Sequence, residues 1–295
     1  MNSYILSCCS IADLSPDHLE ERNIPFAHFH YTMDGKDCAD DMGQTVSSED
    51  FYQAMAAGAE VRTSQVNVEE FTQYFDQFLC DGMDVLHVCL SSGLSGSYNS
   101  ARIAAEMLRE KYPERKLYVV DTLGASAGVG LIVETLADMR DAGADIDTLY
   151  QWIEEHKLEM HYWFTASDLT WFVKGGRITK AAGWFGTALK ICPVLNMDNN
   201  GHLIPRFKIR GISKSLKELV NQMEEHVRDG HDYDGKCFIS HSACEENARQ
   251  VADEIEKRFP LLNGKVGIYN IGTTIGCHTG PGTVALFFWG SKREN

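Results

Sequence analysis

The sequence has few basic residues for its length. Its 27 Lys and Arg residues stand against 42 Asp and Glu residues, which gives a formal net charge of -15. Proteins that bind nucleic acid or dock on anionic lipid need basic surface patches. The charge balance therefore argues against both kinds of partner.

The nine cysteines lack the spacing of a zinc site or of a redox pair. No C-x-x-C occurs, and Cys8 and Cys9 are adjacent, which suits neither an ordinary disulfide nor a zinc site. His28 and His30 share one strand face but have no third ligand nearby, so we expect them to be structural. The N-terminal segment lacks a basic stretch followed by an apolar run. We therefore expect a reduced, cytoplasmic protein without a metal site.

Long apolar runs and nucleotide-binding motifs are also missing. No apolar stretch approaches the roughly 18 residues of a membrane-spanning helix, so we expect no stable membrane insertion. Neither G-x-G-x-x-G nor G-K-[ST] occurs, which leaves a nucleotide site without support. We expect no cofactor.

What the sequence does contain is centred on residues 84–108. An apolar run at residues 85–90 is typical of a strand buried on both faces, and an alanine-rich stripe at residues 101–108 is typical of a helix. The loop between them reads Ser91-Ser92-Gly93-Leu94-Ser95-Gly96-Ser97. Ligands of open α/β sheets bind at the carboxyl ends of strands, where helix N-termini offer N–H groups to anions. The loop is therefore a candidate pocket for a small acid.

Two other interpretations of this loop are open. Serine is a favoured N-cap residue, although one serine would suffice for capping. The loop also sits where a hydrolase would place its nucleophile, but the G-x-S-x-G motif requires glycine at the position of Ser97.

Strands and helices alternate through the first half of the chain. We expect strands at residues 4–6, 24–31 and 117–120, and helices at 47–56, 126–139 and 146–158, with Asn67 capping a further helix. This order indicates βαβ units and a parallel sheet. The second half mixes hairpins with helices, with a hairpin turn at residues 198–201. We predict an α/β protein with an N-terminal domain over residues 1–160 and a second α/β domain over residues 161–295.

Local patterns make four further predictions. Residues 37–44 are expected to form an acidic loop, and residues 276–282 a glycine-rich loop. Ser242 and Glu245 have the spacing of a capping box at the start of a helix. Residues 181–189 follow as a separate segment after Lys174-Gly175-Gly176-Arg177.

Four segments, in this order, carry a specific resemblance: Thr63-Ser64-Gln65, Ser92-Gly93-Leu94-Ser95-Gly96-Ser97-Tyr98, Lys174-Gly175-Gly176-Arg177-Ile178 and Gly276-Cys277-His278-Thr279-Gly280-Pro281-Gly282. Together they resemble the DegV family of bacterial fatty-acid-binding proteins, which work with a fatty acid kinase. The likeness spans essentially the whole chain. It implies two α/β domains, the first a three-layer domain with a parallel sheet and the second mixed, with one acyl chain buried between them or within the N-terminal half.

The resemblance also implies which residues bind the ligand. Thr63 and Ser95 would hold the carboxyl group, with His278 close to it and with Ser64 and Ser92 as further candidates. The protein would then be a carrier without catalytic activity, which binds a long-chain fatty acid and presents its carboxylate to a fatty acid kinase for acyl-phosphate formation.

Arg177 is assigned a different role. It follows two glycines in a tight turn, so we expect it to serve the kinase encounter or the phosphorylated product more than the free acid.

The chain departs from the family at its first strand. The family usually reads T-D-S-T-S-D-L there, whereas this chain reads Ser7-Cys8-Cys9-Ser10-Ile11-Ala12-Asp13-Leu14. Cys8 thus replaces an acidic residue near the expected pocket, while Asp13 remains. Two alternative functions are a serine hydrolase, with Ser95 as nucleophile and His278 as base, and an interaction module with a filled core.

Overall fold

The computed structural model describes residues 4–179 and 191–294. The N-terminal sheet is entirely parallel, with the strand order β2-β1-β6-β7. Its strands are β1 (Tyr4–Cys9), β2 (Phe26–Ala27), β6 (Asp84–Cys89) and β7 (Leu117–Asp121). The apolar residues of β6 are buried because helices cover both faces of the sheet, as the continuous apolar run predicts.

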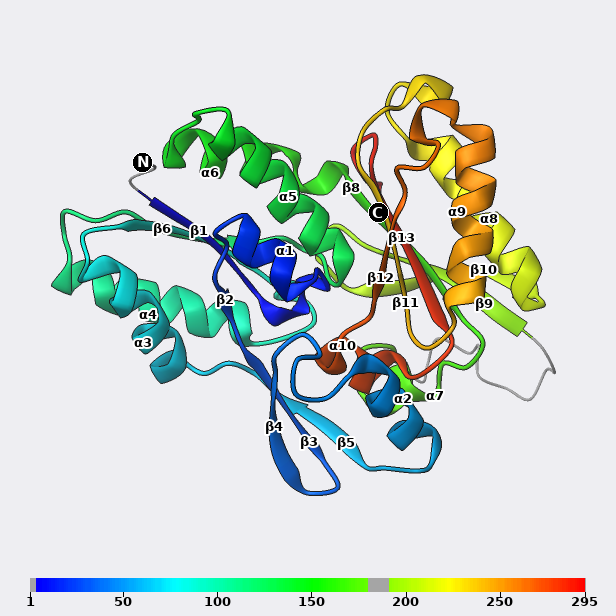
Figure 1. The fold of residues 1–295 in the computed structure, drawn as a ribbon, viewed down its shortest axis with the longest axis horizontal. Helices are drawn as coiled ribbons and strands as arrows, with labels where there is room; N and C mark the ends of the chain where they lie inside the picture. The colour runs from blue at the N-terminus through cyan, green and yellow to red at the C-terminus, as the bar shows by residue number, and fades with distance from the viewer. Residues whose placement is uncertain (1–3, 180–190, 295) are drawn as a thin grey trace.

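These helices complete the predicted three-layer arrangement (Figure 1). One face carries α3 (Val68–Leu79) and α4 (Ser97–Lys111), and the other carries α5 (Ala127–Asp141) and α6 (Ile146–His156), while the short α1 (Pro16–Glu21) lies beside α5. Asn67 caps α3 as predicted, and it forms a full capping box with Glu70.

The C-terminal sheet is mixed, with the order β10-β9-β8-β13-β11-β12. Only β11 and β12 pair in parallel among its described strands. The strands are β8 (Met160–Ala166), β9 (Ile191–Met197), β10 (Leu203–Arg210), β11 (Cys237–His241), β12 (Gly267–Asn270) and β13 (Thr283–Trp289). The associated helices are α7 (Thr170–Lys174), α8 (Ile212–His226) and α9 (Glu245–Arg258). The predicted β9–β10 hairpin is confirmed, and so is the mixed α/β character of this half.

Helix α5 belongs to both halves of the molecule. It contacts β1 of the first sheet and β8, β11 and β13 of the second, and its residues are buried nearly all the way round. A helix without a polar face is typical of such a position between two layers. Its buried Glu134 also forms ion pairs with His18 of α1 at 2.6 Å and with Lys236 at 3.0 Å. The two sheets are thus packed against one shared helix.

A small antiparallel sheet near the N-terminus forms the surface on which a helix from the last third of the chain packs. It has the order β4-β3-β5 and consists of β3 (Phe29–Met33), β4 (Lys36–Asp40) and β5 (Val61–Ser64). With α2 (Ser48–Ala56) it forms a separate core that includes Phe51 and Tyr52. Helix α10 (Thr273–Thr279) packs onto this core through Cys277, and the Tyr52 hydroxyl donates to the carbonyl of Ile271 at 2.9 Å.

Three local predictions are wrong. Residues 36–40 form the edge strand β4 and not an acidic loop, because they pair with β3. The glycine-rich segment around His278 is largely helix α10. The capping box before α9 does not form, since the Ser242 hydroxyl accepts the N–H of Thr283 at 2.8 Å and Cys244 occupies the N-cap.

Two further points complete the fold. The segment at residues 181–189 lies outside the described residues. None of the helices in the described part of the chain combines the length and the apolar character that crossing a bilayer requires.

Candidate functional site

A cavity of about 450 Å³ lies where β5, the loop after β6, α10 and the C-terminal sheet meet. This volume falls within the range of small-molecule pockets. Much of its wall is apolar and comes from the strands of the C-terminal sheet and from α7, including Phe164, Phe172, Met197, Leu203 and Phe287. The polar lining includes Thr63, Ser64, Gln65, Ser95, Arg177 and His278, and also Ser126 and several threonines of α10 and β13. The cavity therefore combines an apolar wall with polar side chains from several segments.

Thr63 and His278 form the centre of the polar lining. The Oγ1 atom of Thr63 on β5 lies 2.8 Å from Nε2 of His278 on α10, within hydrogen-bonding distance. These residues meet because α10 packs against β3 and β5. Burial, and then the positive charge of Arg177, lower the pKa of His278 to about 4. The imidazole is therefore neutral at pH 7.

The other ring nitrogen of His278 is enclosed. Its Nδ1 atom is buried and has no hydrogen-bond partner among the described residues. A Cβ added to Gly175 would lie 2.3 Å from that nitrogen, so only glycine lets the turn approach the ring this closely. The close approach of the Gly175 backbone confines the imidazole beside Thr63.

The serine loop divides its hydroxyl groups between structure and cavity. Ser91 donates to the Gly201 carbonyl at 2.9 Å, and the Ser97 hydroxyl accepts the N–H of Val66 at 3.2 Å. The Ser95 hydroxyl lines the cavity and accepts the N–H of Ser97 at 3.2 Å. A hydroxyl can accept twice and donate once, so Ser95 keeps capacity for a ligand.

Ser92 does not belong to this site. It is exposed and is not part of the cavity lining, and its backbone N–H donates to Asp121 at the end of β7. This bond turns the residue away from the cavity, so the sequence-based prediction that Ser92 binds the ligand is not retained. Ser64, by contrast, lies in the lining beside Thr63.

Arg177 connects the turn after α7 to the serine loop. Its Nε and Nη2 atoms donate to the Leu94 carbonyl at 3.2 and 3.0 Å, and Nη1 donates to the Gly175 carbonyl at 2.6 Å. Burial lowers its pKa, but a guanidinium remains charged in proteins. Three of its five N–H donors bond to described residues, and the other two have no acceptor among these residues. The lining therefore holds a fixed cation beside the neutral imidazole.

The site lacks the contact that a serine hydrolase needs. A catalytic serine must hydrogen-bond to its imidazole base. In the described part of the chain, Ser95 is hydrogen-bonded to Ser97, whereas His278 is paired with Thr63. The observed pairing does not favour nucleophilic catalysis.

The segment that follows the first strand contributes a buried acid, Asp13, whereas position 8 is a cysteine. Cys8 is fully buried in the core and does not line the cavity. Asp13 accepts from the Ser126 hydroxyl and from the N–H of Gly272 at 2.9 Å, and Ser126 lines the cavity. Burial raises the pKa of Asp13 to about 8. Sequence reasoning did not assign Asp13 or Ser126 to the site, because their partners lie more than 100 residues away along the chain.

Comparisons with known proteins identify the family and similar folds. Residues 10–290 match a family model described as "Uncharacterised protein, DegV family". A DegV domain-containing protein of Clostridium perfringens is 35% identical over 294 residues, which cover 100% of both chains. A DegV lipid-binding protein of Thermotoga maritima has a similar structure, with a TM-score of 0.84, 28% identity and 100% coverage of both chains. A fatty-acid-binding DegV family protein of Streptococcus agalactiae matches with a TM-score of 0.84 and 26% identity, covering 97% of this chain and 98% of the other.

Proposed function

The chain belongs to the DegV family, and we propose that it binds a long-chain fatty acid and presents the carboxylate to a fatty acid kinase. One observation carries the proposal: a single cavity joins an extended apolar wall to a compact group of hydrogen-bonding side chains. An amphiphilic ligand with one polar end fits such a lining. The neighbours described as lipid-binding or fatty-acid-binding proteins support the same ligand class.

The apolar wall supplies the affinity. An acid of about 16 carbons offers roughly 14 methylenes, each worth about 0.8 kcal/mol when buried, or about 11 kcal/mol in all. Loss of translational and rotational freedom takes back several kcal/mol. The remainder is sufficient for stable binding if the carboxylate keeps its hydrogen bonds.

The polar group offers those hydrogen bonds. In our proposal Thr63 and Ser95 bind the carboxylate, with Ser64 beside them and with the His278 ring as neighbour. Hydrogen bonds to a charged group contribute about 1.5–3 kcal/mol each, which limits the cost of removing the carboxylate from water. Hydroxyls hold the anion without neutralising it, so it stays available for reaction.

The kinase step concerns Arg177. Phosphoryl transfer to a carboxylate adds negative charge at the polar end of the cavity. The two unused N–H donors of Arg177 lie at that end and would stabilise the acyl phosphate. The protein itself contributes binding and presentation, and the kinase contributes the phosphoryl group.

The test is to identify what the purified protein contains. We expect denaturing extraction and mass spectrometry to find close to one long-chain fatty acid per chain, because an apolar cavity fills readily in a lipid-containing lysate. Added palmitate or oleate should bind to delipidated protein. Repeated preparations without acyl chains, together with no binding of either acid, would contradict the proposal, and labelling of Ser95 by a fluorophosphonate probe would favour the hydrolase.

A further inference from the structure

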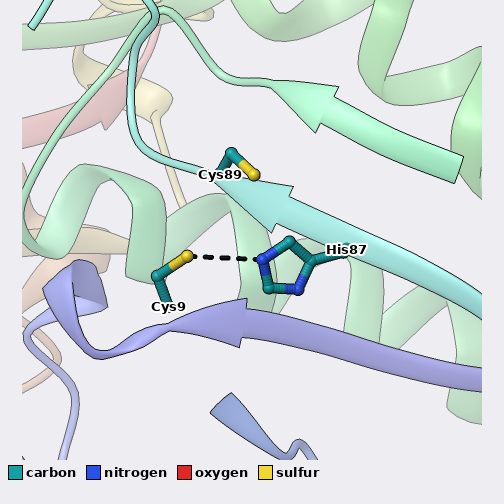
Figure 2. Close-up of side chains that lie close together, drawn as sticks. All are labelled: Cys9, His87 and Cys89. Atoms are coloured by element: carbon teal, nitrogen blue, oxygen red, sulfur yellow. Dashed lines mark hydrogen bonds between the residues drawn. The ribbon is translucent and has the colours of Figure 1, made fainter. Parts of the chain in front are cut away.

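Two thiols and an imidazole form a buried cluster on two neighbouring strands of the N-terminal sheet. Cys9 ends β1, and His87 and Cys89 lie at the end of β6, which pairs with β1 in parallel. The ligand atoms of the three residues all lie within 4.8 Å of one another. Figure 2 shows the Cys9 and Cys89 side chains beside the His87 ring. All three residues are fully buried.

The orientation of His87 suits a metal ligand. Its Nδ1 atom lies 2.8 Å from the hydroxyl of Ser7, and its Nε2 atom faces the sulfur of Cys9 at 3.3 Å. Histidines that bind metals usually hydrogen-bond through the ring nitrogen that does not face the ion. The rings of Phe71 and Phe75 pack edge-on against the His87 ring, with centroid-to-centroid distances of 5.4 and 5.1 Å. This packing restricts the orientation of the imidazole.

Ordinary core packing explains only part of this arrangement. A buried cysteine needs no ligand, because it packs as a small hydrophobic residue. Here two cysteines converge on one imidazole, and the hydroxyl of Tyr74 is buried nearby without a hydrogen bond of normal geometry to a described residue. A buried polar atom without a partner is uncommon in a folded protein. Both features indicate a place for a further polar group.

We propose that Cys9, His87 and Cys89 bind one Zn²⁺ ion. Thiolate and imidazole are the ligands that zinc prefers, with Zn–S and Zn–N distances of about 2.3 and 2.0 Å. Tetrahedral geometry would then separate the Cys9 sulfur and the imidazole nitrogen by about 3.5 Å, so a small opening of the 3.3 Å contact admits the ion.

Charge selects a divalent ion. Two thiolates and a neutral imidazole balance a charge of +2, whereas a monovalent ion would leave an uncompensated negative charge in the sheet interior. Binding transfers the two thiol protons to solvent and involves no oxidation or reduction. A water molecule would complete the tetrahedral coordination as the fourth ligand.

The test measures zinc in the whole protein. Protein from a zinc-supplemented culture, purified without chelators, should contain about one equivalent of zinc by elemental mass spectrometry. The buried position implies that the ion enters during folding, so protein refolded with Zn²⁺ should give the same value. Cobalt(II) in place of zinc should show thiolate-to-metal charge-transfer absorption.

Variants locate the ion. Cys9→Ser and Cys89→Ser should each reduce the zinc content at least tenfold, and Ser7→Ala should weaken zinc binding by about 10–100-fold. Cys8→Ser is the matched control, because successive strand residues face opposite sides of the sheet and Cys8 is equally buried. If a serine variant does not fold, His87→Gln replaces it, with circular dichroism confirming the fold.

Two outcomes would overturn the proposal. One is a folded wild-type protein that holds less than about a tenth of an equivalent of zinc after both growth and refolding with zinc. The other is a loss of zinc in Cys8→Ser as large as that in Cys9→Ser. Fatty acid content is measured on the same samples, so failure of this proposal is distinguishable from failure of the carrier function.

Discussion

In the described part of the chain two histidines are paired with a hydroxyl group, the fully buried His87 and the half-buried His278, and their surroundings differ. His278 pairs with Thr63 across two distant segments and lies in the lining of a cavity. His87 pairs with Ser7 across two neighbouring strands and faces a thiol. In our proposals the same imidazole–hydroxyl pair would support an anion beside Arg177 and a cation beside Cys9. The neighbouring groups, more than the histidine itself, decide which ligand fits.

The largest expected effect is that of Arg177→Ala, which should impair acyl-phosphate formation by the kinase and leave fatty acid binding intact. Arg177→Ala should reduce acyl-phosphate formation with a cognate kinase by about 100-fold, since a removed transition-state donor costs that much in other enzymes. Fatty acid affinity should change little, because the carboxylate bonds to Thr63 and Ser95. The two measurements are ligand titration and turnover in a reconstituted assay.

Arg102→Ala is the control for this variant, because Arg102 is an exposed cation of α4 that pairs with Glu106. Loss of fatty acid binding in Arg177→Ala would make this arginine a ligand of the free acid. Normal turnover would make it a structural link between Leu94 and Gly175.

The next largest effect is expected when a hydroxyl group that faces the cavity is removed. Thr63→Val and Ser95→Ala should each weaken fatty acid binding by about 1–3 kcal/mol, because the carboxylate loses a donor in a buried site. Ser92→Ala, the exposed serine of the same loop, should bind like wild type. Titration with one fatty acid measures all three, and equal affinities throughout would place the carboxylate elsewhere.

The last effect concerns acid sensitivity and distinguishes the enclosed His278 from an ordinary histidine. Its folded-state pKa of about 4 lies below the usual 6.5, so the unfolded chain binds the proton first as the pH falls. The free energy of unfolding should therefore decrease between pH 6.5 and pH 4, by at most about 3 kcal/mol from this residue.

His278→Gln isolates that contribution. The variant should lose less stability than wild type over the same pH interval, as measured by urea unfolding at each pH. His161, whose pKa burial lowers to about 3, contributes to both proteins and cancels in the difference. Parallel stability curves would show that His278 is protonated equally in the folded and unfolded states.

Much of the fold could be predicted from local patterns. The apolar run of β6, the alanine stripe of α4 and the turn between β9 and β10 all form as predicted, because strand alternation, helical periodicity and turn chemistry act over a few residues. The serine loop at the carboxyl end of β6 was also identified correctly as cavity lining, through Ser95.

The tertiary structure decided which residues of each motif face the cavity. Nothing local distinguishes Ser92 from Ser95, and only the folded structure shows that Ser92 is exposed, with its backbone N–H bonded to Asp121 of β7, while Ser95 lines the cavity. The helix around His278 was mistaken for a loop, because its glycines suggest turns while its stability comes from packing against α2 and β3.

The cysteines show most clearly the difference between what local sequence patterns predict and what the tertiary structure decides. By itself the sequence placed Cys89 in an apolar strand and Cys9 in the segment after the predicted strand at residues 4–6, and their spacing gave no metal motif. Whether they meet depends on the order and register of strands some 80 residues apart, since His87 lies opposite Ser7 only when β1 and β6 are neighbours. Register is set by long-range packing and not by the residues of either strand alone. That pairing placed two thiols beside one imidazole, just as the docking of α10 placed His278 beside Thr63.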